Sequence, residues 1–228
     1  MTAPDPARRF AALVKRARAE LGDAPYSPPT TAEGGDPIVQ ELLLSFLAWE
    51  SGPARAEAAL KRLVHAVVDY NELRVCLPDE LVTIIGERYP RGLERCARMR
   101  SALNEVYRRE HAVTLQPLTV MPKRDAWQYL ASLEGVPGFV AARVTLLSLS
   151  GHAFPLDERL LGLLRDEKAA PPEVSVDEAC GWLERQVHAG EAAPAYLAVE
   201  AWAAQRQAPK PARRTTPPRA RRESRSQS

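Results

Sequence analysis

The sequence predicts an all-α fold, and three observations support it. The 228 residues are 45% hydrophobic but only 6% aromatic, with alanine, leucine, arginine and glutamate prominent. Those residues favour helices, and runs of β-branched residues are short. Apolar residues recur at helical spacing between breaks made by glycine and proline. A chain of this length can bury one good-sized core or two small helical lobes.

The N-terminal segment, residues 1–22, is expected to be a docking helix that ends at Gly22. Its apolar face consists of Phe10, Leu13, Val14 and Ala17, with basic residues around it. The alternative is a basic arm that contacts nucleic acid. Residues 23–37 are rich in Pro, Gly and Thr and are expected to form a linker loop.

Residues 38–164 are expected to form a helical core. Its first helix, 38–49, is apolar on most sides, as central helices are, with Asp36 as N-cap and Pro37 in the first turn. Hydrophobic spacing predicts further helices over 54–68, 79–85, 93–109, 125–132, 139–148, 158–164, 174–187 and 193–205. Residues 70–74 are expected to form only a connecting turn.

The most informative segment is 130–164. A helix-like run stops at Gly135-Val136-Pro137-Gly138, a second apolar helix starts at Phe139, and Asp157 stands at the start of a third helix. Glycines let the backbone turn at positive φ and approach another surface, and the free amides of the following helix favour a phosphate. The alternative is an ordinary helix–helix turn, with Asp157 acting only as an N-cap.

This segment resembles the helix-hairpin-helix core of the endonuclease III superfamily of DNA glycosylases. The family pattern is LPGVGxKTAxxV, followed about eighteen residues later by VD at a helix start. The matching residues are Leu133, Gly135, Val136, Ala141, Val144, Leu156 and Asp157. The resemblance implies a two-lobed helical bundle in which residues 165–207 pack with the N-terminal helix.

The resemblance also implies a partner and a reaction. Gly135, Val136 and Gly138 would hold a phosphate of double-stranded DNA, with a monovalent cation as an added ligand, and Asp157 would be the catalytic carboxylate for hydrolysis. Arg143 lies one turn into the second helix, where it would reach a phosphate or stay on the surface. Lys123 and Arg124 are weaker candidates of the same kind.

Three departures from the family pattern bear on that activity. Pro137 occupies the second glycine slot and supplies no N–H. Phe139 occupies the slot of the nucleophilic lysine, which excludes Schiff-base chemistry there and makes Phe139 a candidate pocket residue. Leu47 stands where the wedge glutamine would fall; it and Trp49 are expected in the core, the alternative being a hydrophobic wedge.

The resemblance therefore implies a monofunctional DNA glycosylase. Two alternatives stay open: a DNA-binding relative that has lost catalysis, and a helical interaction protein with no DNA role. No metal or cofactor is expected. Only Cys180 follows Leu164, whereas the family's iron–sulfur cluster needs four clustered cysteines, and the four histidines are too scattered for a zinc site.

The charge is distributed unevenly along the chain. Residues 208–228 hold seven of the 31 basic and one of the 29 acidic residues, a net +6, which leaves 24 basic and 28 acidic residues, a net −4, in 1–207. The C-terminal tail is rich in Pro, Arg, Ser and Thr, so we expect it to be disordered and to contact nucleic acid; the alternative is a tail without function. The net negative charge of residues 1–207 favours the hypothesis of a helical interaction protein with no DNA role.

The sequence contains no apolar stretch of about 20 residues and no apolar signal core, so no membrane contact is expected. The odd, scattered set of three cysteines suits reduced thiols. We therefore expect a cytoplasmic monomer.

Overall fold

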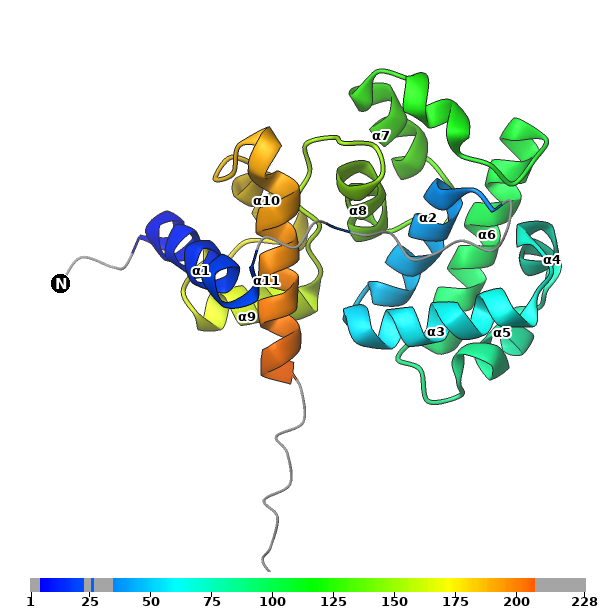
Figure 1. Cartoon of the computed structure of the whole chain (residues 1–228), viewed down its shortest axis with the longest axis horizontal. Coiled ribbons are helices and arrows are strands. Elements are labelled where there is room, and N and C mark those ends of the chain that lie inside the picture. Colours follow the sequence, from blue (N-terminus) through cyan, green and yellow to red (C-terminus); the bar gives the residue numbers. More distant parts are fainter. Residues whose placement is uncertain (1–4, 23–25, 27–34, 208–228) are drawn as a thin grey trace, which may run out of the picture.

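The computed structural model describes residues 5–22, 26 and 35–207, and all regular structure in those residues is helical (Figure 1). The prediction of an all-α fold is therefore confirmed. The basic tail and most of the expected linker lie outside the described residues. The helices are α1 (Pro6–Leu21), α2 (Pro37–Ala48), α3 (Pro53–Ala66), α4 (Tyr70–Val75), α5 (Pro78–Ile85), α6 (Gly92–Glu110), η1 (Gln116–Val120), α7 (Lys123–Ala131), α8 (Gly138–Leu147), α9 (Glu158–Asp166), α10 (Val176–Glu184), η2 (Ala189–Glu191) and α11 (Ala192–Gln207).

The helices form two lobes, each with its own apolar core. The larger lobe is built from α2–α8 and the smaller one from α1 and α9–α11 (Figure 1). The leucines of α9, which the predicted core range of 38–164 includes, pack in the core of the smaller lobe. No helix in the described part of the chain has the length and apolar character needed to cross a bilayer.

Helix α2 runs through the centre of the larger lobe, and all of its residues after Pro37 are buried. Its start is fixed by Asp36, as predicted, because the carboxylate accepts hydrogen bonds from the amides of Ile38 (2.8 Å) and Leu115 (2.7 Å). The same side chain thus caps the helix and anchors the segment before η1.

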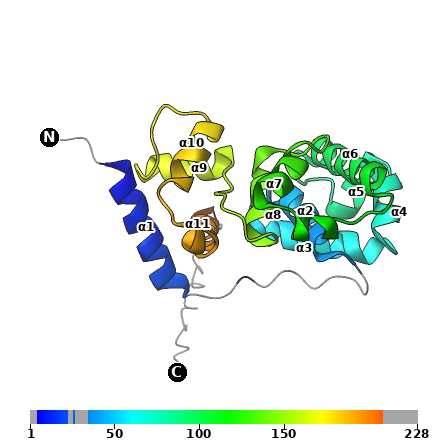
Figure 2. The ribbon, with the colours of Figure 1, turned by 90° about the horizontal axis from the view of Figure 1, so that it is seen from above.

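Helix α8 lies on the side of the larger lobe that faces the smaller one (Figure 2). Val140 and Val144 pack in the core of the larger lobe, whereas Ala142 and Leu146 pack in the core of the smaller one. A helix that contributes to two cores must be apolar on both sides, which explains why α8 is apolar apart from Arg143 and Thr145.

The smaller lobe brings together segments from opposite ends of the described chain. Helix α1 packs on α11, and the Phe10 ring meets Phe154 edge to face at 5.6 Å between centroids. An ion pair from Arg18 to Glu191 (2.5 Å) adds a polar contact at the rim.

One local prediction was wrong. Residues 70–75 form α4 instead of a turn, because Asp69 accepts a hydrogen bond from the amide of Glu72 (2.8 Å) and caps the helix. Tyr70 and Leu73 of this helix are buried, so packing stabilises it although it has only six residues.

Candidate nucleic-acid interface at the lobe junction

The hairpin between α7 and α8 lies at the surface. Gly135 has φ +81°, and a Cβ at this position would lie 3.1 Å from the backbone of Arg98. Glycine therefore allows the turn to approach α6 closely. Residues 135–137 are partly exposed and Gly138 is exposed, so the bend is accessible to a ligand.

Trp49 and two arginines extend the surface beside the hairpin. The guanidinium of Arg91 lies 4.5 Å from the Trp49 ring centroid and that of Arg98 5.5 Å from it. Arg98 also lies 3.5 Å from the Gly135 carbonyl oxygen through Nη1. We call this set (Trp49, Arg91, Arg98 and residues 135–138) the hairpin surface.

Glu94 lies between these arginines and accepts hydrogen bonds from Arg91 (2.8 Å) and Arg98 (3.0 Å). The hydrogen bond from Arg91 lowers the pKa of Glu94 most, and Arg98 lowers it further. Because two guanidiniums face one carboxylate, the cluster carries a net positive charge on an exposed edge of a chain whose first 207 residues are acidic overall.

The loop Gly86–Arg91 joins this edge to the end of α2. The hydroxyl of Tyr89 donates to the Leu47 carbonyl oxygen (2.8 Å) and lies 3.2 Å from Ser51 Oγ. Arg88 and Arg91 of the same loop are exposed. Three loops that are distant in sequence, after α2, after α5 and after α7, therefore meet on one edge of the larger lobe.

Leu47 and Phe139 lie in the apolar core, with 0% and 3% exposure. Neither side chain presents a surface to a DNA strand, so the core location expected for Leu47 is what the structure shows. Trp49, at the C-cap of α2, is partly exposed. Of the three residues considered as wedge or pocket, it alone is partly open to solvent.

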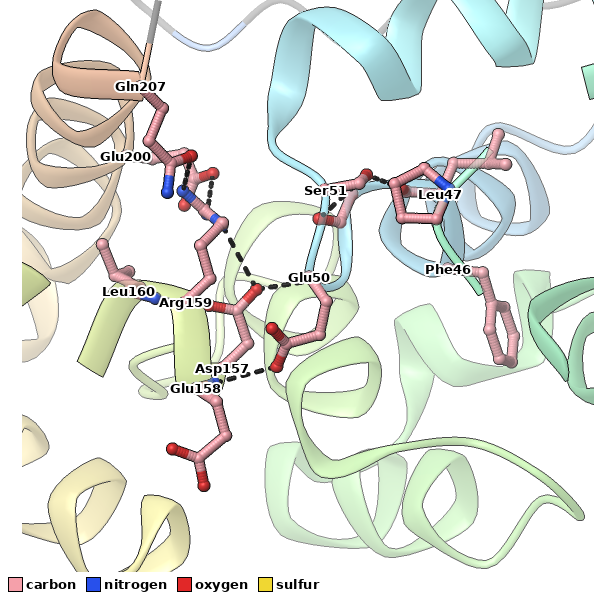
Figure 3. Close-up of polar contacts among 12 residues, drawn as sticks. Phe46, Leu47, Glu50, Ser51, Asp157, Glu158, Arg159, Leu160, Glu200 and Gln207 are labelled. Atoms are coloured by element: carbon pink, nitrogen blue, oxygen red, sulfur yellow. Dashed lines mark hydrogen bonds and ion pairs between the residues drawn. The ribbon is translucent and has the colours of Figure 1, made fainter. Parts of the chain in front are cut away.

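Asp157 lies at the junction between the lobes, where it caps α9 (Figure 3). Its Oδ1 accepts the Leu160 amide (2.8 Å), and its Oδ2 accepts the Glu50 amide (2.8 Å) and lies 3.6 Å from Arg159 Nε. The side chain is 0% exposed. The N-cap position predicted from the sequence is thus correct, and both carboxylate oxygens are occupied by protein donors.

Glu50 is a residue of the same junction that sequence reasoning missed. It follows α2 with φ +56°, and its Oε1 accepts the Glu158 amide (2.9 Å) at the start of α9 (Figure 3). Burial, and next the negative charge of Asp157, raise the pKa of Glu50. No local pattern marks this residue, because its importance arises only when α9 of one lobe meets the α2–α3 loop of the other.

The prediction that Arg143 contacts a DNA phosphate is wrong for this structure. Arg143 is 5% exposed, and its Nη1 donates to the Glu41 carboxylate and to Ser45 Oγ (3.2 Å). Tyr26 donates to the same carboxylate. The cause is the double-sided burial of α8, which takes the arginine inside, where it must meet an opposite charge. Lys123 and Arg124 are exposed at the start of α7.

No protein-family model and no curated protein sequence matches the chain. Solved structures do match it. One is a trapped covalent intermediate of endonuclease III with DNA, with a TM-score of 0.66, 13% identity, and coverage of 85% of this chain and 84% of that one. The chain has the fold of the helix-hairpin-helix DNA glycosylases. Two further matches are structures of an 8-oxoguanine glycosylase/lyase from Clostridium acetobutylicum.

The complex of that Clostridium enzyme with duplex DNA containing cytosine opposite 8-oxoguanine has a TM-score of 0.62 at 13% identity and covers 89% of this chain and 71% of that one. Its apo form has a TM-score of 0.58 at 14% identity and covers 85% and 69%.

Proposed function

We propose that this protein binds duplex DNA on the hairpin surface and releases a base by hydrolysis, without a lyase step. The observation that supports the proposal most is the convergence of the hairpin, the Trp49–arginine cluster and two carboxylates at one junction of a glycosylase fold. Arginines and exposed backbone amides bind phosphate, and an aromatic ring can stack on a base.

The absence of a lyase step follows from the residue in the lysine slot. A lyase needs an amine that attacks the sugar and forms a Schiff base. Phe139 offers none, and its ring is 3% exposed in the core. Hydrolysis needs only a carboxylate near the anomeric carbon and a water molecule. The proposal involves no iron–sulfur cluster, because Cys180 is the only cysteine after α9.

The alternative of a DNA-binding relative without catalysis is favoured by one observation. Asp157, the catalytic candidate, has a fully buried carboxylate with protein donors on both oxygens. If it alone carried the chemistry, a bound nucleotide would not reach it in this conformation.

Duplex binding by the hairpin surface predicts a steep dependence on salt. We expect the double variant R91A/R98A of the full chain to bind a duplex more weakly than wild type. Because each phosphate contact contributes about 0.9 to the slope of log K against log salt, loss of two contacts should make that slope shallower by roughly 2. A fluorescence-anisotropy salt series measures it.

The matched control is Arg8→Ala on α1, which removes an exposed arginine (90% side-chain exposure) from the other lobe. Its slope should equal that of wild type. Phosphate contacts made elsewhere in the chain are present in all three proteins, so they do not change the difference between the slopes. Wild-type affinity that does not change with salt, or equal slopes for all three proteins, would contradict binding at this surface.

Base hydrolysis predicts a specific product pattern. In single-turnover incubations with a panel of duplexes, each bearing one damaged or mismatched base, we expect one or more to lose that base. Strand breaks should appear only after treatment with alkali, because hydrolysis leaves an intact abasic strand, and borohydride should trap no protein–DNA adduct. Spontaneous breaks or a trapped adduct would contradict a monofunctional enzyme, and no base release from any duplex would favour the non-catalytic alternative.

A further inference from the structure

Two carboxylates meet at the start of α9, and they differ in what can reach them. The Asp157 side chain is 0% exposed and receives protein donors on both oxygens. Glu50 is partly exposed. A group that touches substrate must be open to the junction surface, so accessibility separates the two residues.

Glu50 is held in place by a reciprocal exchange of hydrogen bonds. Its backbone amide donates to Asp157 Oδ2 (2.8 Å), while its own Oε1 accepts the Glu158 amide (2.9 Å) (Figure 3). The side chain and backbone of one residue are thereby fixed to the other lobe. A pre-positioned carboxylate of this kind costs little reorganisation when charge develops beside it.

The position of Glu50 also suits a bound strand. It follows Trp49 directly in the chain, and Trp49 is part of the hairpin surface. A strand bound on the hairpin surface and in contact with Trp49 would therefore lie close to Glu50. Burial and the charge of Asp157 raise the pKa of Glu50, which increases its ability to accept a proton.

We propose that Glu50 is the catalytic carboxylate of this protein and that Asp157 is a positioning residue which fixes the Glu50 backbone. The inference rests on the proposed function. In the reaction, the bond from C1′ of the sugar to the base nitrogen breaks, its electron pair leaves with the base, and the base takes a proton from solvent. The ionised Glu50 side chain stabilises the positive charge on C1′, and a water molecule then adds to C1′ and gives its proton to Glu50.

The test uses two duplexes that differ only in one abasic-site analogue. One carries a pyrrolidine, which is cationic at neutral pH and mimics the charge on C1′, and the other carries a neutral tetrahydrofuran. Wild-type protein should bind the cationic duplex at least about tenfold more tightly, equivalent to about 1.4 kcal/mol. Glu50→Gln should bind both duplexes about equally, with its affinity for the tetrahydrofuran duplex unchanged.

Three further variants make the comparison specific. Glu158→Gln removes an exposed carboxylate from the residue that directly follows Asp157 and should keep the full preference. Glu50→Asp restores the charge and should recover part of the preference. Asp157→Asn should retain the preference at a temperature where circular dichroism shows that it is folded.

The contrary outcomes are distinct. A preference that survives in Glu50→Gln but disappears in folded Asp157→Asn would overturn the assignment and return the catalytic role to Asp157. Equal binding of the two duplexes by wild type would overturn the role of Glu50 while leaving DNA binding intact. Binding of neither duplex would overturn both this inference and the proposed function.

Discussion

Replacement of Asp157 by alanine is expected to lower the free energy of unfolding by about 3–5 kcal/mol, the range found when one partner of a buried ionic group is removed. The variant loses the cap of α9, leaves the Glu50 amide without its acceptor, and removes one of the carboxylates facing Arg159. Urea denaturation followed by circular dichroism measures the loss. Asp157→Asn should lose less, because asparagine also caps helices well.

The matched control is Asp5→Ala. Asp5 caps α1 in the same way, accepting the Ala7 amide (3.1 Å), but its side chain is 55% exposed. Its removal should cost about 1 kcal/mol, the usual value of an N-cap. Equal losses at the two caps would show that Asp157 does no more than start its helix, and would contradict its role in joining the lobes.

Replacement of Arg143 by methionine is expected to destabilise the fold by a similar amount, about 3–5 kcal/mol, because it leaves Glu41 as an uncompensated charge in the core. The two side chains are 6% and 0% exposed, respectively. Simultaneous replacement of Glu41 by leucine should restore most of the stability, since a well-packed apolar pair can substitute for a buried ion pair. An exposed pair offers the control: Arg16→Met, which breaks a contact with Glu167 at 3.4 Å, should cost about 0–1 kcal/mol.

The loss in Arg143→Met should also depend on pH. Burial already raises the pKa of Glu41 above its ordinary value of 4.5, and removal of the arginine takes away the charge that opposes this shift. A carboxyl whose pKa is higher in the folded state binds its proton on folding, so stability falls as pH rises from the unfolded to the folded pKa. The deficit of the variant should therefore shrink as the pH is lowered toward about 4.5, and a deficit independent of pH would contradict this explanation.

The sequence predicted those parts of the fold that depend on local signals. The helical class, the glycine hairpin at Gly135 and the caps at Asp36 and Asp157 are all specified by neighbouring residues, and the structure contains each of them. Helix α4 was missed because it has only six residues, two of them buried, and so short a helix carries little periodic signal.

The chemistry of the junction was harder to predict, since it depends on contacts between distant segments. Arg143 and Glu41 each stand in a largely apolar helix, and their charges are opposite. That combination indicates a buried ion pair and could have been recognised from the sequence. Glu50 gave no such signal. Its role depends on a bond to an amide 108 residues away, which no pattern in the α2–α3 loop encodes.

The packing of α1 on α11 has a consequence for synthesis on the ribosome. The two helices begin 186 residues apart, at residues 6 and 192, so at roughly 5–20 residues per second α1 waits roughly 10–40 s for its partner to be made. All the helices of the larger lobe are complete before α11 emerges. Throughout that interval the face of α1 that packs on α11 lacks its partner. The four arginines and one lysine of α1 favour its solubility until translation delivers the surface that covers it.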